Sequence, residues 1–188
     1  MEYIVSNVEI SGAARISSNL WIKGNFREQE GGLYLLEGYI VDYHIKDVVE
    51  YCRRGLGTHY ANGAYNILFY NKSEDKLEIK TDKRTTLSLY VYEKAGVFAY
   101  SNNPWLLVKQ FYGEMTVDVD SLKAQLLYFA DYHSTRTLFT NLSRVDGASY
   151  VCFDVAHNSK KSVCYWAFTY TPDPATDLNR SLEKADSD

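Results

Sequence analysis

Cysteine is scarce in this sequence of 188 residues. Cys52, Cys152 and Cys164 are its three cysteines, and no two of them stand at C-x-x-C spacing. An odd number of cysteines without paired spacing argues against a disulfide framework and against a zinc site. The scattered histidines, such as His44 and His59, also lack the spacing of metal ligands. We therefore expect buried free thiols and no metal site.

Long basic runs are missing as well. The chain has 20 Lys and Arg residues against 24 Asp and Glu residues, which gives a formal net charge of −4. Its basic clusters are doublets such as Arg53-Arg54 and Lys160-Lys161. A nucleic-acid partner requires a basic face that displaces counterions from the phosphates. The sequence therefore predicts no nucleic-acid partner.

Apolar runs are short, and none approaches the length of about 20 residues that a membrane-spanning helix needs. A signal peptide begins with cations, whereas Met1 is followed here by the acidic Glu2. We expect no membrane contact and a cytoplasmic protein. The apolar share of 46% and the charged share of 23% are typical of a globular domain, and the length is sufficient for a core.

Strand-forming residues are abundant, with 17 tyrosines among them. The glycine-bearing stretch Gly24–Gly32 is expected to be a turn region, and pairing of the last two strands would set Cys152 roughly opposite Cys164. Apolar periodicity and turn signals predict these strands: Glu2–Ile10, Asn19–Lys23, Leu33–Val41, Ala64–Tyr70, Leu77–Thr81, Leu87–Tyr92, Val97–Ser101, Ala148–Val155 and Ser162–Phe168.

Helical spacing appears in three places. Ile45–Arg54 has apolar residues at helical intervals, Asn103-Pro104 is typical of a helix start that continues to about Phe111, and Asp118 or Asp120 begins a helix that runs to Asp131. Hairpins with grouped helices indicate an α+β protein in which stacked sheets are covered by helices. The prolines after Tyr170 indicate a domain over residues 1–170, followed at 171–188 by a linker or the start of a missing domain.

Five short motifs follow one another along the strand-rich part of the chain: Gly63–Asn71, Asp82–Tyr90, Phe98–Ser101, Thr137–Gly147 and Tyr165-Trp166. In order and spacing they resemble the motifs G-x-F-A-x-x-(I/L)-(Y/W)-D, D-R-x-G-x-x-P-L-Y, F-x-S-E, T-L-F-x-x-I-x-x-L-x-P-G and Y-W. These belong to the glutaminase domain of the asparagine synthetase family, a class II, Ntn-type glutamine amidotransferase. The resemblance implies a four-layer αββα sandwich of two antiparallel sheets, the Ntn-hydrolase-like fold.

The resemblance also implies that the catalytic group is missing. The nucleophile of that family is an N-terminal cysteine exposed by removal of methionine, and its free α-amino group is the general base. Glu2 stands at that place here, and a carboxylate does not replace a thiolate in attack on an amide. The chain therefore resembles degenerate members without the cysteine, such as β-lactam synthetases and lasso-peptide cyclases.

The positions that resemble the family's glutamine pocket depart from its pattern too. Where the family has N-G-E, this chain has Glu37-Gly38-Tyr39, and the second substrate-binding acid of the family falls on Ile45. A negative charge on Glu37 would repel the oxyanion that develops during attack on the amide. Loss of one good hydrogen-bond donor from an oxyanion hole already raises the barrier by about 3 kcal/mol. The resemblance implies no catalytic residue and a vestigial substrate pocket formed by Glu2, Glu37, Gly38, Tyr39 and Ile45.

Three hypotheses for function follow. The first is an inactive amidotransferase-like domain that supports an ATP-dependent synthetase, with an ATP-pyrophosphatase domain of the asparagine synthetase type as its partner in cis or in trans. ATP and magnesium are then expected only in that partner, and homodimer formation stays open. The second is a binding module for a small molecule or peptide in the vestigial pocket, with aromatic walls from Tyr39, Tyr65, Tyr90 and Tyr100. The third, a hydrolase with another nucleophile such as Ser6, has the least support.

Overall fold

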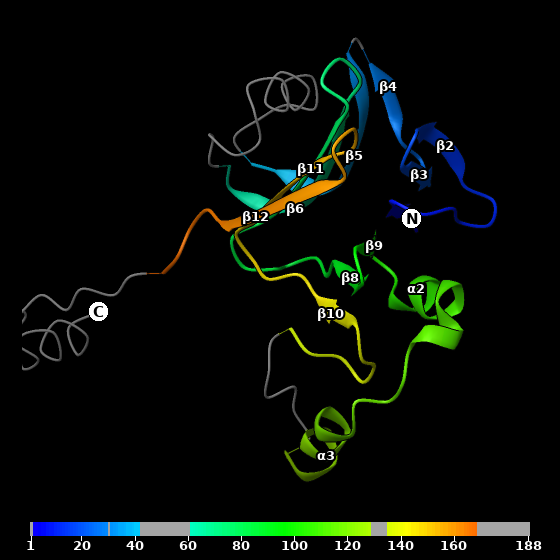
Figure 1. Ribbon diagram of the computed structural model, residues 1–188. Coiled ribbons are helices and arrows are strands. Elements are labelled where there is room, and N and C mark those ends of the chain that lie inside the picture. The colour runs from blue at the N-terminus through cyan, green and yellow to red at the C-terminus, as the bar shows by residue number, and fades with distance from the viewer. Residues whose placement is uncertain (1, 30, 42–60, 129–134, 169–188) are drawn as a thin grey trace, which may run out of the picture.

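The computed structural model describes residues 2–29, 31–41, 61–128 and 135–168 (Figure 1). Their strands form two antiparallel sheets of six strands each. Sheet A contains, in spatial order, β10 (Leu142–Arg144), β8 (Tyr90–Lys94), β9 (Val97–Ser101), β1 (Ile4–Ser6), β3 (Leu20–Lys23) and β2 (Ala14–Ser17). Sheet B contains β12 (Ser159–Cys164), β11 (Ser149–Asp154), β7 (Lys76–Thr81), β6 (Gly63–Asn71), β5 (Gly32–Ile40) and β4 (Arg27–Gln29).

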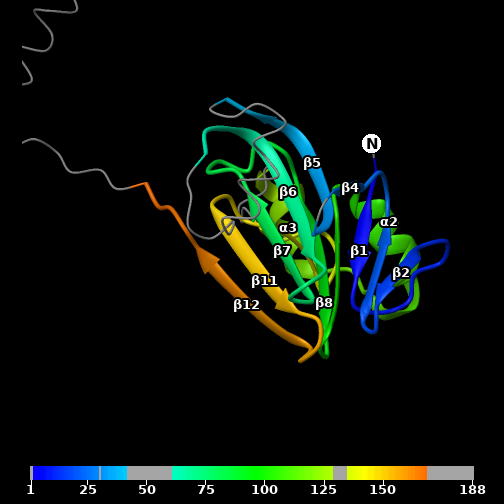
Figure 2. The same cartoon turned by 90° about the horizontal axis from the view of Figure 1, so that it is seen from above.

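The main core lies between the two sheets. Val5 of β1 and Leu68 of β6 are fully buried and belong to the same apolar cluster, which draws residues from both sheets. Phe98 of β9 meets Phe153 of β11 edge to face, with ring centroids 4.5 Å apart. Alternation along each strand sends every second side chain into this layer, so the sheets are stacked face to face (Figure 2).

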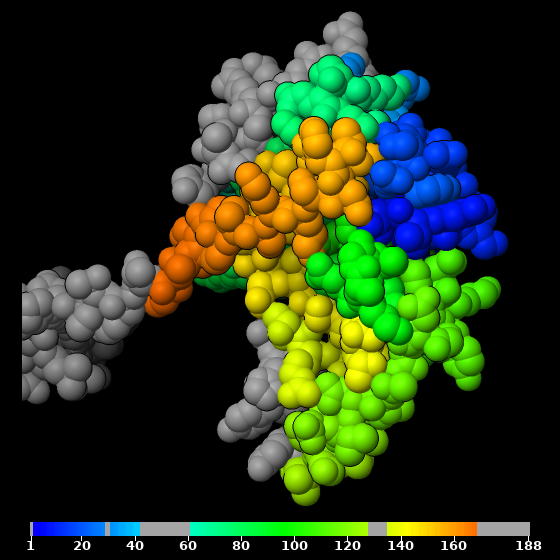
Figure 3. Space-filling view, in the orientation of Figure 1, coloured from blue at the N-terminus to red at the C-terminus, as the bar shows by residue number. Residues whose placement is uncertain are grey.

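A helix covers the outer face of sheet A. α2 (Pro104–Gln110) buries Leu107 against Ile4 of β1, and the ring of Phe111 stacks on Tyr92 of β8 at 4.0 Å. The cap predicted at Asn103 is confirmed, because its side-chain oxygen accepts a hydrogen bond from the Trp105 amide at 2.9 Å. The space-filling view shows the N-terminal strands, in blue, packed against the green segment that carries α2 (Figure 3).

The predicted α+β class and the pair of antiparallel sheets are confirmed. Three of the four expected layers lie within the described residues, namely α2 and the two sheets. The helix predicted at 45–54 and the linker predicted at 171–188 fall outside the described residues. Within the described parts of the chain, neither α2 nor α3 combines the length and the apolar character that a membrane crossing requires.

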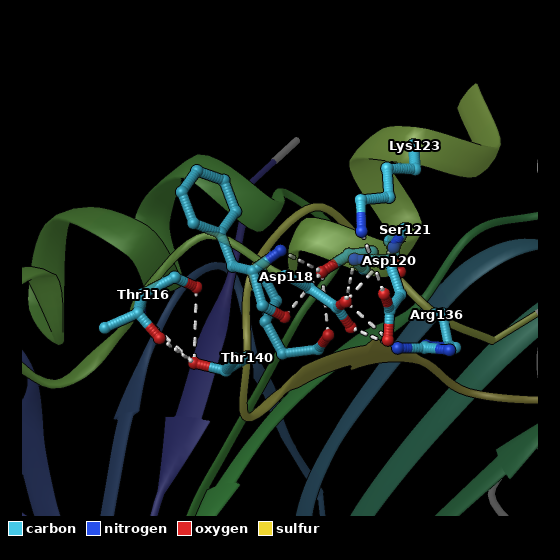
Figure 4. A network of polar contacts seen from close by, with 10 residues as sticks. Thr116, Asp118, Asp120, Ser121, Lys123, Arg136 and Thr140 are labelled. Atoms are coloured by element: carbon cyan, nitrogen blue, oxygen red, sulfur yellow. Dashed lines mark hydrogen bonds and ion pairs between the residues drawn. The ribbon is translucent and has the colours of Figure 1, made fainter. Parts of the chain in front are cut away.

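A polar network attaches α3 (Val119–Tyr128) to the segment that precedes β10 (Figure 4). Asp118 caps the helix, with its carboxylate accepting hydrogen bonds from the Asp120 and Ser121 amides at 3.1 Å each. Arg136 donates to both carboxylate oxygens of Asp118, at 2.9 and 2.7 Å. These contacts settle which aspartate caps α3, a choice that the sequence leaves open between positions 118 and 120.

Replacing Arg136 with alanine is expected to raise the pKa of Asp118 while leaving it below the ordinary value of an aspartate. The Ser121 amide is the largest cause of the lowered pKa of Asp118 and remains in the variant, whereas the Arg136 guanidinium, the second cause, is lost. A titration of the carboxyl carbon by NMR measures the pKa of Asp118 in both proteins. An unchanged pKa would show that Arg136 does not pair with Asp118 in solution.

Several sequence predictions for sheet edges are wrong. The strand β4 lies inside Gly24–Gly32, which was expected to be a turn, and the short strands β2 and β10 were not expected at all. The last hairpin also has a different register: Cys152 lies opposite Lys161, and Cys164 lies opposite Ser149.

The turn of this hairpin explains the error in register. The Asp154 carboxylate accepts a hydrogen bond from the His157 amide at 3.0 Å, and Asn158 takes a left-handed conformation with φ of 48°. Asparagine tolerates that conformation better than most residues. The turn is therefore tight enough for β12 to begin at Ser159 instead of Ser162.

Candidate functional site

The structure contains a cavity of about 710 Å³. Its lining comes from the residue before β1, the loop that leaves β3 and the middle of β5. Its volume falls within the range of about 300–1,000 Å³ that small-molecule sites usually have. The lining residues are Tyr3, Gly24, Asn25, Phe26, Arg27, Tyr34, Leu35, Leu36, Glu37 and Gly38.

The half-buried carboxylate of Glu37 is the centre of a hydrogen-bond network at this cavity. Its Oε2 accepts from the Tyr3 hydroxyl at 3.2 Å and from Nδ2 of Asn66 at 2.9 Å. Its Oε1 accepts from Nδ2 of Asn102 at 2.8 Å. The donors come from the residue before β1, from β6 and from the segment after β9, so the network joins the two sheets.

Tyr3 is fixed by hydrogen bonds at its backbone and at its side chain. Its backbone amide donates to Oδ1 of Asn102 at 3.2 Å, while its hydroxyl donates to Glu37. Burial, followed by the negative charge of Glu37, raises the pKa of the Tyr3 hydroxyl far above its ordinary value. The hydroxyl therefore keeps its proton, so that Tyr3 acts as a hydrogen-bond donor and not as a nucleophile.

Asn66 is a fully buried polar residue in the middle of an otherwise apolar strand. Its Nδ2 donates to Glu37 and, at 3.4 Å, to the carbonyl of Leu87. With the amide turned this way, Oδ1 has no hydrogen-bond partner. An unpaired buried acceptor is unfavourable, so the orientation of Asn66 is set by its interaction with the Glu37 carboxylate.

Gly24 allows the loop after β3 to approach Tyr3 closely. Its φ is +138°, and an added Cβ would lie 2.7 Å from the Cβ of Tyr3. A larger residue would force the loop away from the start of β1. This contact places Asn25 and Phe26 in the lining of the cavity.

The structure brings some of the predicted pocket residues together. Glu37 and Gly38 line the cavity, and Glu2 lies in the adjoining segment, where its carboxylate accepts a hydrogen bond from Nδ2 of Asn103 at 2.6 Å. Tyr39 is 62% exposed and is not a lining residue. Ile45 lies outside the described residues.

The other tyrosines proposed as aromatic walls do not line the cavity either. Tyr65 and Tyr100 are fully buried in two different apolar clusters, and Tyr90 packs against a third. Tyr34, which lines the cavity, was not singled out from the sequence. Most of the aromatic residues proposed for the pocket therefore serve the core.

Other candidate groups lie away from the cavity. Ser6 is fully buried, and its hydroxyl donates to the carbonyl of Phe98 at 2.8 Å, so it is not placed to attack a ligand. Cys152 is half-buried on β11 and Cys164 is exposed on β12, and neither lines the cavity. Within the described residues, no three His, Cys, Asp or Glu side chains gather in a way that would hold a metal ion.

Sequence reasoning missed Tyr3, Asn66 and Asn102 as members of this site. Asn66 interrupts an apolar strand, and a polar residue at a buried strand position must find a partner. Asn102 comes directly after the strand that ends at Ser101, so its amide side chain lies beyond the sheet. These two signals pointed to polar partners, although neither identified Glu37 as the group that they contact.

Comparisons with known proteins add little to this picture. No family model and no curated protein matches the chain. Among solved structures, the chain is similar to a glutamine phosphoribosylpyrophosphate (PRPP) amidotransferase from B. subtilis complexed with ADP and GMP. The TM-score is 0.43 at 12% sequence identity, and the similarity covers 75% of this chain and 31% of that protein. This chain thus matches about a third of the length of the amidotransferase.

Proposed function

We propose that this chain is a catalytically inactive, glutamine amidotransferase-like domain that supports an ATP-dependent amide-forming enzyme of the asparagine synthetase type. The observation that carries the proposal is the chemistry of the segment that leads into β1. Glu2 and Tyr3 occupy it, and the side chains of both are engaged in hydrogen bonds. Neither supplies the thiol that attack on a carboxamide requires.

The surroundings of the cavity support the same proposal. In a glutaminase, hydrogen-bond donors stabilise the negative charge that develops on the attacked carbonyl oxygen. Here Asn66 and Asn102, which could donate, already donate to the Glu37 carboxylate. The cavity wall thus presents a carboxylate that already engages these two amide donors.

Because the described residues that line the cavity include no thiol, we propose that the chemistry resides in a partner. An ATP-pyrophosphatase domain of the asparagine synthetase type, in cis or in trans, would hold ATP and magnesium. In such an arrangement this domain stabilises the synthetase half and shapes access to it.

Incubation with glutamine is expected to release no glutamate above the rate in buffer. The described residues near the cavity contain no thiol, and Tyr3 keeps its proton. A coupled glutamate assay measures the rate, with a working glutaminase as the positive control. Glutamate release that disappears in a Ser6→Ala or Glu2→Ala variant would contradict the proposal and identify the reacting residue.

A second candidate function is that of a binding module for a small molecule. The specific observation in its favour is the 710 Å³ cavity, whose polar wall is already organised by the Glu37 network. A ligand that binds only the folded protein raises its melting temperature. A thermal-shift screen against amino acids, amines and nucleotides tests this role. If no compound raises the melting temperature, only the supporting role remains.

A further inference from the structure

Glu37 is a charged group whose described partners are all neutral. Its carboxylate accepts hydrogen bonds from Tyr3, Asn66 and Asn102, none of which is a cation. No ion pair among the described residues includes Glu37. Neutral donors orient a carboxylate without cancelling its charge, and a half-buried charge without a counter-ion is unfavourable.

The geometry leaves room for one more partner. An ionised carboxylate has about four lone-pair positions, and three donors occupy three of them. Glu37 lines the cavity, so the remaining position is within reach of a molecule bound there. The donors that surround the carboxylate also fix its direction before any ligand arrives, which lowers the entropy lost on binding.

The other lining residues fit a cation with an apolar body. Phe26 is half-buried and Leu35 is buried, so both supply apolar surface, and an aromatic ring also attracts cations. Arg27 is the other charged residue in the described part of the lining, but its side chain is exposed, and water and salt screen it more than they screen Glu37.

A metal ion fits this site less well than an organic cation. Metal ions are bound by several oxygen, nitrogen or sulfur ligands at once, and among the described lining residues Glu37 is the one acidic side chain. An ammonium or guanidinium group, by contrast, can donate a hydrogen bond to the open position of the carboxylate.

We propose that the cavity binds a small organic cation, an ammonium or guanidinium group on a short apolar stem, with the Glu37 carboxylate as its counter-ion. This inference rests on the binding role of the cavity and specifies the class of ligand. It differs from the glutamine site of the resembling family in the position of the acid, because Glu37 stands where that family has the asparagine of its N-G-E motif.

Three ligands of similar shape, one positive, one neutral and one negative, test the proposal on the unmodified chain. The probes are n-butylammonium, its neutral counterpart n-butanol, and butyrate. In isotope-labelled protein, the amide resonances of Gly24 and Gly38 report on occupation of the cavity, because both residues line it. We expect saturable shifts with the ammonium, and binding on the order of tenfold tighter than that of the alcohol, because hydrogen bonds between charged groups are the stronger ones.

The variant Glu37→Gln retains the size of the side chain and removes its charge. It is expected to bind n-butylammonium roughly tenfold more weakly than the unmodified chain, to the level of the alcohol. Glu74→Gln is the matched control, because Glu74 is exposed, pairs with Lys76 and does not line the cavity. This control variant is expected to bind like the unmodified chain.

The outcomes separate the cation preference from the binding role of the cavity. Equal binding of all three probes, tighter binding of butyrate, or unchanged ammonium binding in Glu37→Gln would overturn the cation preference while the cavity remained a binding site. If no probe shifts the resonances of Gly24 and Gly38, both the cation preference and the binding role are wrong. The charge series on the unmodified chain decides the question even if the Glu37 variant does not fold.

Discussion

Replacing Asp82 with alanine is expected to lower the free energy of unfolding by about 4 kcal/mol. Asp82 is 1% exposed, and its carboxylate accepts hydrogen bonds from the backbone amides of Tyr65, Arg84 and Thr86 at 3.3, 2.7 and 3.0 Å. Alanine would leave these three donors without their acceptor. Chemical denaturation monitored by circular dichroism measures the loss.

Asn71→Ala is the matched control for that experiment. Asn71 likewise accepts from two backbone amides, those of Ser73 and Glu74, but at an exposed turn. Water can take over these bonds, so the control is expected to lose less than about 1 kcal/mol. If both variants lose the same amount, burial is not what makes Asp82 important.

Replacing Gly38 with alanine is expected to lower the free energy of unfolding by about 3 kcal/mol. Gly38 has φ of +89°, a conformation that is strained for residues with a Cβ. An alanine Cβ would also lie 2.0 Å from the carbonyl oxygen of Ala64, on the strand paired with β5. The backbone of β6 cannot move aside without disturbing its own pairing, so the clash is not relieved by a side-chain rotation.

Gly96→Ala separates the two contributions. Gly96 has a similar φ of +81°, but an added Cβ there would meet nothing within 4 Å. Its variant is expected to lose only about 1 kcal/mol, the conformational part of the effect. Thermal and denaturant unfolding of both variants measure the difference, and equal losses would mean that β5 and β6 are not in the contact described.

Prediction from sequence succeeded where a local pattern decides the structure. The apolar run 64–70 becomes the buried strand β6, and Asn103-Pro104 begins α2 as capping chemistry requires. It failed at short, polar edge strands such as β4, whose residues Arg27 and Glu28 carry no apolar alternation. Such strands form because a neighbouring strand offers free backbone groups, and that neighbour is not visible in a local window.

The candidate site was only partly predictable for a related reason. Glu37 and Gly38 were found through the resemblance to a known family. The partners of Glu37 are 29, 34 and 65 residues away in sequence, at Asn66, Tyr3 and Asn102. Strand pairing brings Asn66 opposite Glu37, and the stacking of the two sheets brings the other two. No spacing rule along the chain contains this information.

The edge strand β12 has a consequence for the behaviour of the protein at high concentration. An open edge of a sheet can pair with the edge of another molecule, and this is a common route to aggregation. The strand carries Lys160, which pairs with Glu93, and the exposed Lys161. When two such edges approach, the Lys161 side chains repel each other and lose water. The exposed charge on β12 therefore opposes growth of sheet B by edge-to-edge pairing.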